Sequence, residues 1–430
     1  MLADYIFESP PSQWEVTSLG EVCGRTGGNI QTGPFGSQLH ASDYVPFGIP
    51  SIMPENLSDN RVNTEGIAHI RQEDATRLSR YLVHPGDIVY SRRGDVTKRA
   101  LAGKEHDGWL CGTGCLRVRF GSNQVNPRFA FYYLGHPLVR EWISRHAIGA
   151  TLPNLNTSIL SGLPFLLPPP GEQAALAEIL GVLDDKIELN RKMNETVEAI
   201  ARAIFKSWFV DFDPVRAKSA GRQTSGMDAA TAALFPDSFQ ASQVGMVPKG
   251  WSPTAWGKLV SLEYGKALSN YSHEDGAYPV YGTNGRIGSC SEPLCRHPGI
   301  VIGRKGAYRG VHFSRTPFFA IDTAFYVVPK TTLEMRWAWY EMLRNDINGM
   351  DSGSAIPSTS REDFYGLPVV VPPLRVQQQF AHLLNACWDH QARNEEQDRT
   401  LAAIRDTLLP KLISGEIRVR DAEKLVEKTL

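Results

Sequence analysis

Residues Gly149–Val215 read GATLPNLNTSILSGLPFLLPPPGEQAALAEILGVLDDKIELNRKMNETVEAIARAIFKSWFVDFDPV, and Gly353–Val419 read GSAIPSTSREDFYGLPVVVPPLRVQQQFAHLLNACWDHQARNEEQDRTLAAIRDTLLPKLISGEIRV. The two stretches align without a gap, and the match extends over their whole length. An ungapped match this long indicates an internal repeat. The paired residues include Pro153 with Pro357, Gln173 with Gln377, Leu180 with Leu384, Asn190 with Asn394, Ile200 with Ile404 and Val215 with Val419.

Each copy contains a long helical segment that begins after a run of prolines. Glu172–Trp208 contains no proline and one glycine, and its apolar residues form a narrow stripe of heptad type that recurs in the second copy. Polar residues interrupt both stripes at matching places and could specify the register of a helix pair. We predict that the helices pack on each other, although each could instead pack on its own module. The predicted seam comprises Leu180, Leu183, Ile187, Asn190, Val197, Leu384, Cys387, Asn394, Leu401 and Ile404.

A variable module precedes each helix, opening near Trp14 in the first half and near Trp251 in the second. Short apolar or alternating runs bounded by glycine and proline predict strands, and we expect one or two helices among them, such as Arg128–Trp142 and Leu333–Arg344. The predicted class is therefore α+β. We expect a first module over residues 1–165, a helical region over 166–215, a connector with a second module over 216–369, and a second helical region over 370–430.

Composition excludes several classes of protein. The 430 residues carry 45 Lys and Arg against 46 Asp and Glu, so any binding of nucleic acid must depend on local positive charge. No apolar run approaches the roughly 20 residues of a membrane span, and the start MLADYIFESPPSQW does not resemble a signal peptide. The six cysteines have no CxxC spacing or companion histidine cluster. We expect a cytoplasmic protein with reduced thiols, no membrane association and no metal site.

A search for catalytic motifs finds none of the common ones. The sequence has no G-x-G-x-x-G, G-x-x-x-x-G-K-[ST], H-E-x-x-H or G-x-S-x-G pattern. The glycines in Tyr281–Gly288 predict a hairpin turn around Asn284-Gly285. A shared catalytic carboxylate pair at Asp211 and Asp213 is disfavoured, because glycine and isoleucine replace them in the second copy, which favours a simple turn. We expect no catalytic residue in this chain.

Positive charge is concentrated in two loops. SRRGDVTKR and GRKGAYRG each follow a short apolar strand and contain glycine, which lets a backbone approach a phosphodiester closely. A solvated surface loop is the alternative, but the corresponding position of the two loops favours contact with DNA. Tyr308 and Phe313 could stack on bases, although core packing is the commoner role. The candidate DNA-binding residues are Arg92, Arg93, Lys98, Arg99, Arg304, Lys305 and Arg309.

Over essentially its whole length the chain resembles the DNA-specificity subunit of a type I restriction-modification system. The segments that carry the resemblance are long and distinctive. They are TGPFGSQLH at Thr32–His40, LPNLN…LPFLLPPPGEQ at Leu152–Gln173, LDDKIELNRKMNETVEAIARAIFKSWFVDFDPVRAK at Leu183–Lys218, GMDAATAALFPDSF at Gly226–Phe239, VPKGW at Val247–Trp251, IVIGRKGAYRG at Ile300–Gly310, AIDTAFYVV at Ala320–Val328, and the terminal LRVQQQF…LLPKLISGEI.

The resemblance implies two α/β target recognition domains joined by two long antiparallel helices, with pseudo-twofold symmetry. Each domain would read one half of an asymmetric, bipartite site in double-stranded DNA, and the helices would fix the spacer between the halves. Two modification subunits would dock on the helices and methylate adenine with S-adenosylmethionine. Restriction subunits would add a nuclease and translocase that use ATP and Mg²⁺. This chain would itself bind no cofactor and catalyse no reaction.

Two alternatives remain at this point. The chain could serve a related system whose methylase and nuclease are fused in one subunit, which the neighbouring genes would reveal. It could also be a coiled-coil scaffold that does not bind DNA, in which case salt-sensitive, sequence-specific binding would be absent. A stand-alone enzyme is disfavoured by the missing cofactor loops.

Overall fold

The computed structural model divides into two compact units, and each unit contains half of both long helices. Unit 1 comprises Met1–Arg191 and Glu395–Leu430, and unit 2 comprises Lys192–Asn394. The predicted boundaries at residues 165, 215 and 369 separate the helices from the modules. Each compact unit instead combines one module with half of both helices. The structure describes residues 12–58, 60–121, 124–149, 153–269, 271, 276–350, 353 and 356–429.

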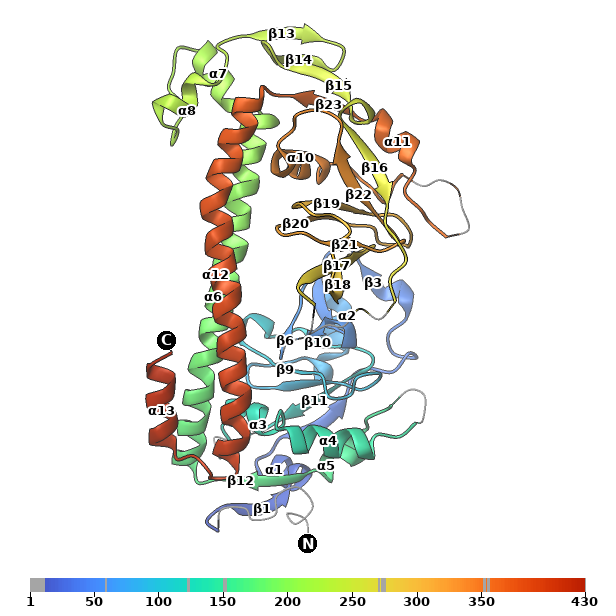
Figure 1. The fold of residues 1–430 in the computed structure, drawn as a ribbon. Helices are drawn as coiled ribbons and strands as arrows, with labels where there is room; N and C mark the ends of the chain where they lie inside the picture. The colour runs from blue at the N-terminus through green and yellow to red at the C-terminus, as the bar shows by residue number, and fades with distance from the viewer. Residues whose placement is uncertain are drawn as a thin grey trace. The chain divides into compact units, whose positions relative to one another are not determined.

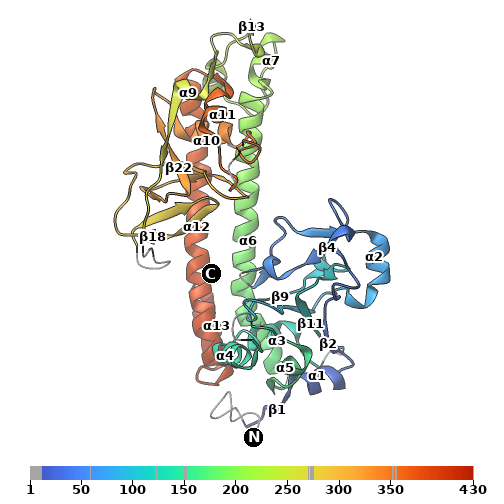
Figure 2. The same cartoon turned by 90° about the vertical axis from the view of Figure 1, so that its right-hand side faces the viewer.

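The two long helices are equal in length and lie at equivalent places in the repeat. α6 spans Pro170–Phe209 and α12 spans Leu374–Ile413, 40 residues each. In unit 1 the first half of α6 packs on the second half of α12, and in unit 2 the remaining halves pack together (Figures 1 and 2). The helices are therefore antiparallel within each unit, and the prediction that they pair is confirmed.

The predicted seam residues form part of the buried face of both helices. Leu180, Leu183, Leu384 and Leu401 are at most 1% exposed. The other apolar seam residues, Ile187, Val197, Cys387 and Ile404, are half-buried. Burying a leucine side chain stabilises a fold by roughly 1.5–3 kcal/mol, so the seam is a substantial part of the core of each unit.

The first module in unit 1 is built from two four-stranded sheets. An antiparallel sheet has the order β2 (Asn29–Thr32), β11 (Cys115–Arg119), β8 (Ile88–Ser91) and β9 (Arg99–Leu101). A mixed sheet has the order β10 (Leu110–Cys111), β4 (Ile49–Ile52), β7 (Ala68–Ile70) and β3 (Tyr44–Val45). The unit also contains β1 (Glu15–Ser18), β5 (Leu57–Ser58), β6 (Arg61–Val62), β12 (Pro164–Leu167), α1 (Leu19–Arg25), α2 (Gln72–Arg77), α3 (Pro127–Tyr133), α4 (Pro137–His146), α5 (Thr157–Ser161) and α13 (Val419–Glu427).

The second module in unit 2 repeats the first of these sheets and replaces the other. Its antiparallel sheet has the order β16 (Val260–Tyr264), β22 (Ala324–Pro329), β19 (Gly299–Gly303) and β20 (Val311–Ser314). The other sheet has three strands, β18 (Gly285–Cys290), β17 (Tyr278–Gly282) and β21 (Phe319–Ala320). The remaining elements are β13 (Phe239–Ser242), β14 (Gly245–Pro248), β15 (Ser252–Ala255), β23 (Pro368–Val371), α7 (Asp213–Ser219), α8 (Ala229–Ala233), α9 (Trp256–Leu259), α10 (Met335–Met342) and α11 (Arg361–Gly366).

Both modules thus share a common half and differ in the other half. The strand that enters each long helix pairs in the same way, β12 with β1 and β23 with β15. The sequence repeat covers only the last part of this common half, and strand pairing extends the likeness back to the first strand of each module. The class predicted from the sequence, α+β modules joined by paired helices, is confirmed.

Two buried glutamines attach the modules to the helices in the same manner. The Gln173 side chain donates to the Pro168 carbonyl at 2.8 Å and accepts from the Asn126 backbone N–H at 2.8 Å. Its repeat partner Gln377 donates to the Pro372 carbonyl at 2.8 Å and accepts from the Glu334 backbone N–H at 3.0 Å. Because Asn126 and Glu334 cap α3 and α10, each glutamine fixes the start of a module helix to the start of a long helix.

Aromatic side chains fill the space between the second module and its helices, where the Tyr340 ring of α10 lies 5.4 Å from the Phe380 ring of α12. In unit 1 the Phe129 and Tyr133 rings of α3 lie 6.3 and 4.6 Å from the Phe165 ring of β12, the strand that enters α6. Since both clusters are continuous with the seam, a module cannot shift on its helices without opening a hydrophobic core.

The local structure corrects one expected helix and contains the expected hairpin. The helix expected over Arg128–Trp142 is wrong as one element, because α3 ends at Tyr133 and α4 begins at Pro137, whose ring fixes the first turn. The expected hairpin is present as β17 and β18. Asp211 and Asp213 lie at the turn that leads into α7, where Ser207 donates to Asp213 at 2.7 Å and Lys206 pairs with Asp211. All six cysteines are free, and three of them are buried.

Candidate nucleic-acid interface

The basic loops predicted from the sequence occupy equivalent places in the two modules. Arg92 and Arg93 follow β8, and Arg304 and Lys305 follow β19, which is the third strand of the matching sheet. The Leu155 N–H donates to the Arg92 carbonyl at 2.8 Å, and the Thr359 N–H donates to the Arg304 carbonyl at 2.9 Å.

These two backbone bonds are the same bond made twice, because Leu155 and Thr359 are paired in the sequence repeat. The neighbouring bridges agree, since Arg93 pairs with Asn154 and Lys305 pairs with Ser358. Each basic loop is therefore held by the segment that begins the repeat. The sequence alone placed the loops at similar strand ends, and the structure gives their register.

In unit 1, two of the four candidate residues are exposed. Arg93 and Lys98 are open to solvent, and within the described part of the chain neither forms an ion pair with an acidic side chain. Arg92 is half-buried, donates from Nε to the Asn154 side chain at 3.2 Å, and lies 5.6 Å from the ring of the exposed Phe35. Arg140 on α4, which sequence reasoning missed, joins this surface by donating to Thr97 at 3.2 Å.

A neighbouring carboxylate keeps its charge within this basic surface. Partial burial opposes ionisation of Asp95, but hydrogen bonds from Thr97 and the charges of Lys98 and Arg140 together lower its pKa below the usual value. Asp95 therefore orders the loop through two bonds to Thr97, at 3.0 and 2.7 Å. The loop keeps an excess of positive charge despite this one acid.

Arg99 differs from the expectation, because it faces the interior of the protein. It is 6% exposed, donates from Nε to the Phe131 carbonyl at 3.2 Å and lies 4.7 Å from the Phe131 ring. Burial lowers the pKa of Arg99 to about 10. A guanidinium in this position stabilises the contact between β9 and α3 and is not available to a phosphate.

Arg309 in unit 2 is likewise internal. It is 4% exposed, and its guanidinium donates to the carbonyls of Gly306 at 3.2 Å and Asn348 at 2.7 Å. Its own N–H donates to the Asn348 side chain at 2.7 Å. Arg309 therefore fixes the shape of the basic loop. Lys305 is exposed, and the half-buried Arg304 donates to the Asp322 carbonyl at 2.7 Å.

A second arginine joins Arg304 over a shared tyrosine ring. The guanidinium of Arg304 lies 4.8 Å from the Tyr264 ring, and that of Arg361 lies 5.2 Å from the same ring, which is 49% exposed. A hydrogen bond with the Tyr365 hydroxyl raises the pKa of Arg361. Two half-buried cations thus lie beside one exposed aromatic ring, an arrangement suited to phosphate contact. Sequence reasoning missed Arg361 and Tyr264 because nearly a hundred residues separate them.

The polar residues within the helix seam form a matching pair of contacts. In unit 1 the Asn190 amide donates to Gln397 at 2.9 Å and to Asp398 at 2.8 Å. In unit 2 the Asn394 amide donates to Asn194 at 2.7 Å. The repeat pairs Asn190 with Asn394 and Asn194 with Asp398, so each unit contains one copy of the same contact. Hydrogen-bonded polar pairs inside an apolar seam specify the register of the helices.

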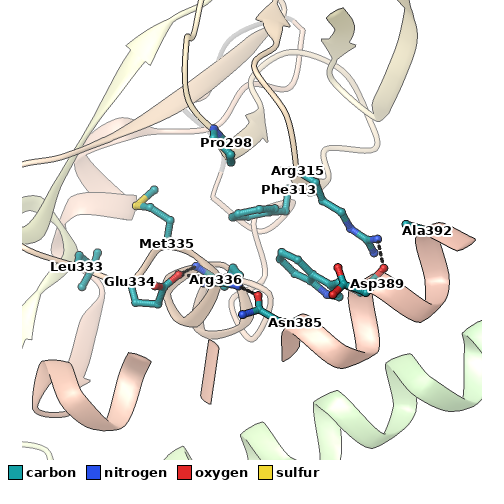
Figure 3. Close-up of a pocket in the computed structure, with 11 residues that line it drawn as sticks. Pro298, Phe313, Arg315, Leu333, Glu334, Met335, Arg336, Asn385, Asp389 and Ala392 are labelled. Carbon is teal, nitrogen blue, oxygen red and sulfur yellow. Dashed lines mark hydrogen bonds and ion pairs between the residues drawn. The ribbon is translucent and has the colours of Figure 1, made fainter. Parts of the chain in front are cut away.

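A cleft of about 580 Å³ lies in unit 2 between the second module and α12 (Figure 3). Arg336 donates to Glu334 at 2.9 Å and also bonds Asn385. Arg315 donates to the Trp388 carbonyl at 3.1 Å. No Ser, Cys, His or Lys is among the lining residues, and both arginines are bound to the protein. The cleft therefore lies at the junction between the second module and α12, and its arginines join the two by bonding Trp388 and Asn385.

The described residues lack both a metal-ligand cluster and a membrane-spanning helix. No group of three or more His, Cys, Asp or Glu side chains there is arranged to hold a metal ion. Within the same residues, no helix combines the length and the apolar character needed to cross a membrane.

Comparison with known proteins finds similarity to restriction-system subunits. A family model described as the type I restriction modification DNA specificity domain matches residues 11–199. The type I restriction enzyme MjaIX specificity subunit of Methanocaldococcus jannaschii is 24% identical over 96% of this chain and 95% of its own length. The HindI specificity subunit of Haemophilus influenzae is 35% identical over 34% of this chain and 33% of its own length.

A solved structure agrees with the fold. The crystal structure of a type I restriction-modification system S subunit from M. genitalium matches with a TM-score of 0.50 at 18% identity, covering 93% of this chain and 96% of that chain. At this level of identity the likeness concerns the fold alone.

Proposed function

We propose that this chain, which belongs to the DNA-specificity subunits of type I restriction-modification systems, reads an asymmetric, bipartite site in double-stranded DNA. The observation that carries the proposal is the equivalence of the two basic loops. Each loop follows the third strand of the same sheet and is held by the same residue of the repeat. One phosphate-binding device thus occurs once in each module.

The differences between the modules explain why the site would be asymmetric. The shared sheet carries the basic loops, and phosphate contacts fix the position of a protein on DNA without reading its sequence. The other sheet has four strands in unit 1 and three in unit 2, so the surfaces that could reach base edges are unlike. Two unlike readers on a repeated frame would select two different half-sites.

The paired helices would set the length of the unread spacer. Their seam is buried, and its two polar contacts allow one register only. We propose that the same helices dock two modification subunits, which use S-adenosylmethionine to methylate adenine in each half-site. Restriction subunits that use ATP and Mg²⁺ would complete a complex acting in the cytoplasm.

In this scheme the chain supplies recognition and its partners supply the chemistry. Methylation of adenine requires the base to leave the duplex stack, so the complex would distort the DNA it reads. This chain would bind none of the cofactors itself. Its contribution is to hold two readers and two partner subunits in fixed relation to one DNA segment.

Methylome sequencing tests the proposal directly. Cells that express this chain with the neighbouring modification subunit are compared with cells that lack this chain. We expect a bipartite methyladenine motif that appears only when the chain is present, and that motif also gives both half-sites. An active, bound modification subunit that leaves no chain-dependent mark would contradict the proposal and favour a scaffold.

A further inference from the structure

The basic loop of unit 2 carries an exposed aromatic side chain in addition to its cations. Tyr308 lies between Lys305 and Arg309 in the sequence and is 79% exposed. Phe313, the other aromatic residue near this loop, packs instead on Trp339 and Trp388, with ring centroids 5.7 and 5.0 Å apart. Tyr308 is therefore the ring that the loop presents to solvent.

The loop that presents this ring is rigid. The N–H groups of Arg304 and Gly306 donate to the carbonyls of Thr323 and Pro357, each at 2.9 Å. The N–H of Gly310 donates to the Thr283 carbonyl at 3.1 Å. With the bonds that Arg309 makes to Gly306 and Asn348, these contacts fix both ends of the loop and leave Ala307 and Tyr308 as its tip.

The equivalent loop in unit 1 folds its apolar residue inward. Val96 lies between the Arg93 and Arg99 positions and is 3% exposed. The outward ring is thus a property of the second module and not of the shared frame. A hydrogen-bonded loop that displays a large aromatic ring beside the exposed Lys305 is pre-organised for binding, because docking then restricts little backbone freedom and a tyrosine has only two side-chain torsions to restrict.

We propose that the Tyr308 ring stacks on a base of the second half-site, at a step that opens when the complex distorts the DNA. This inference rests on the proposed function. Lys305 and the Arg304–Tyr264 pair, at the start of the same loop, would hold nearby phosphates, so the charges of the loop would bring the ring to the duplex edge. Aromatic residues inserted at a base step take over part of the stacking that an opened step loses.

Base–aromatic stacking predicts the size of the effect. Removing one such ring weakens binding by about 5- to 150-fold in Kd. Because the ring carries no charge, the dependence of Kd on salt concentration should stay the same. The Tyr308→Phe variant keeps the stacking face and should bind like the parent.

The test uses the specificity chain assembled with its modification subunits and a duplex that contains the site found by methylome sequencing. Binding is measured for the parent protein, Tyr308→Ala, Tyr308→Phe and a matched control, Met246→Ala, which removes another exposed side chain of unit 2. 2-Aminopurine placed in turn at each position of the second half-site reports which base is unstacked or stacked on protein.

We expect one 2-aminopurine position whose fluorescence differs between the parent complex and Tyr308→Ala, together with the 5- to 150-fold loss of affinity. Equal Kd values and equal fluorescence profiles for the parent and Tyr308→Ala would overturn the inference. Specific binding by both proteins would then leave the proposed function standing. A parent complex that does not distinguish the site from a scrambled duplex would overturn the proposed function first, and the inference with it.

Discussion

The polar contact in the unit 1 half of the helix seam makes the sharpest stability prediction. Asn190 is fully buried, and its amide donates to Gln397 and to Asp398. Replacing Asn190 by Ala removes one bond to a neutral acceptor and one to a carboxylate, worth about 0.5–1.5 and 1.5–3 kcal/mol. We expect the free energy of unfolding to fall by about 2–4 kcal/mol.

The repeat supplies a matched control for this variant. Asn394 occupies the equivalent position in unit 2, but its partner Asn194 is neutral. Asn394→Ala should therefore cost only about 0.5–1.5 kcal/mol. Urea unfolding of the full chain, followed by circular dichroism, measures both. Equal losses, or a larger loss for Asn394→Ala, would refute the reasoning from the charged acceptor.

The stability of Asn190→Ala should also depend on pH, with a sign that follows from Asp398. Burial raises the pKa of Asp398, and the hydrogen bond from Asn190 opposes that rise. Without Asn190 the pKa rises further, so the folded variant binds its proton at a higher pH than the unfolded chain does. The free energy of unfolding of Asn190→Ala therefore rises as the pH falls through the raised pKa of Asp398. The difference in free energy of unfolding between this variant and the parent should narrow there.

Three further outcomes follow from the loops and the helices. Replacing Arg304 and Lys305 by Ala should weaken binding to all DNA sequences and reduce the salt slope by about 1 for each phosphate that is no longer neutralised, whereas an unchanged slope would remove these residues from the interface. Arg99→Ala should lower the free energy of unfolding by about 1–3 kcal/mol, while Arg93→Ala, at an exposed site, should stay within about 0.5 kcal/mol; thermal unfolding tells them apart. Inserting seven residues within Lys186–Thr196 and seven in the matching stretch of α12 lengthens the helix pair by about 10 Å. The spacer in the methylated motif should then grow by roughly three base pairs, and an unchanged spacer would contradict the role of the helices in spacing.

The sequence predicted the frame of the molecule because the frame is repeated. Matching heptad stripes and matching asparagines indicated which helices pair. Their starts followed from proline runs that recur at the same offset. The buried role of Gln173 and Gln377 was hidden, because a glutamine after a proline run looks the same in sequence whether it is solvated or bridges two elements.

The candidate interface was predicted less well, for a physical reason. A basic run fixes the number of charges but not their direction, which depends on strand register. Arg99 begins β9 and is buried against α3, whereas Lys98, in the loop just before the strand, is exposed. Arg361 and Tyr264 meet only because α11 lies against β16, which no local pattern reveals.

The division of the helices between units has a consequence for synthesis of the protein. Unit 2 is a continuous stretch of chain, whereas the core of unit 1 includes Leu401, Leu408 and Leu412 together with Ala422 and Val426 of α13. The first module to leave the ribosome therefore cannot complete its core until the last residues are made. A nonsense mutation after Asn394 should leave the second reader folded and disable the first. Loss of the carboxyl terminus would thus erase the amino-terminal half of the specificity.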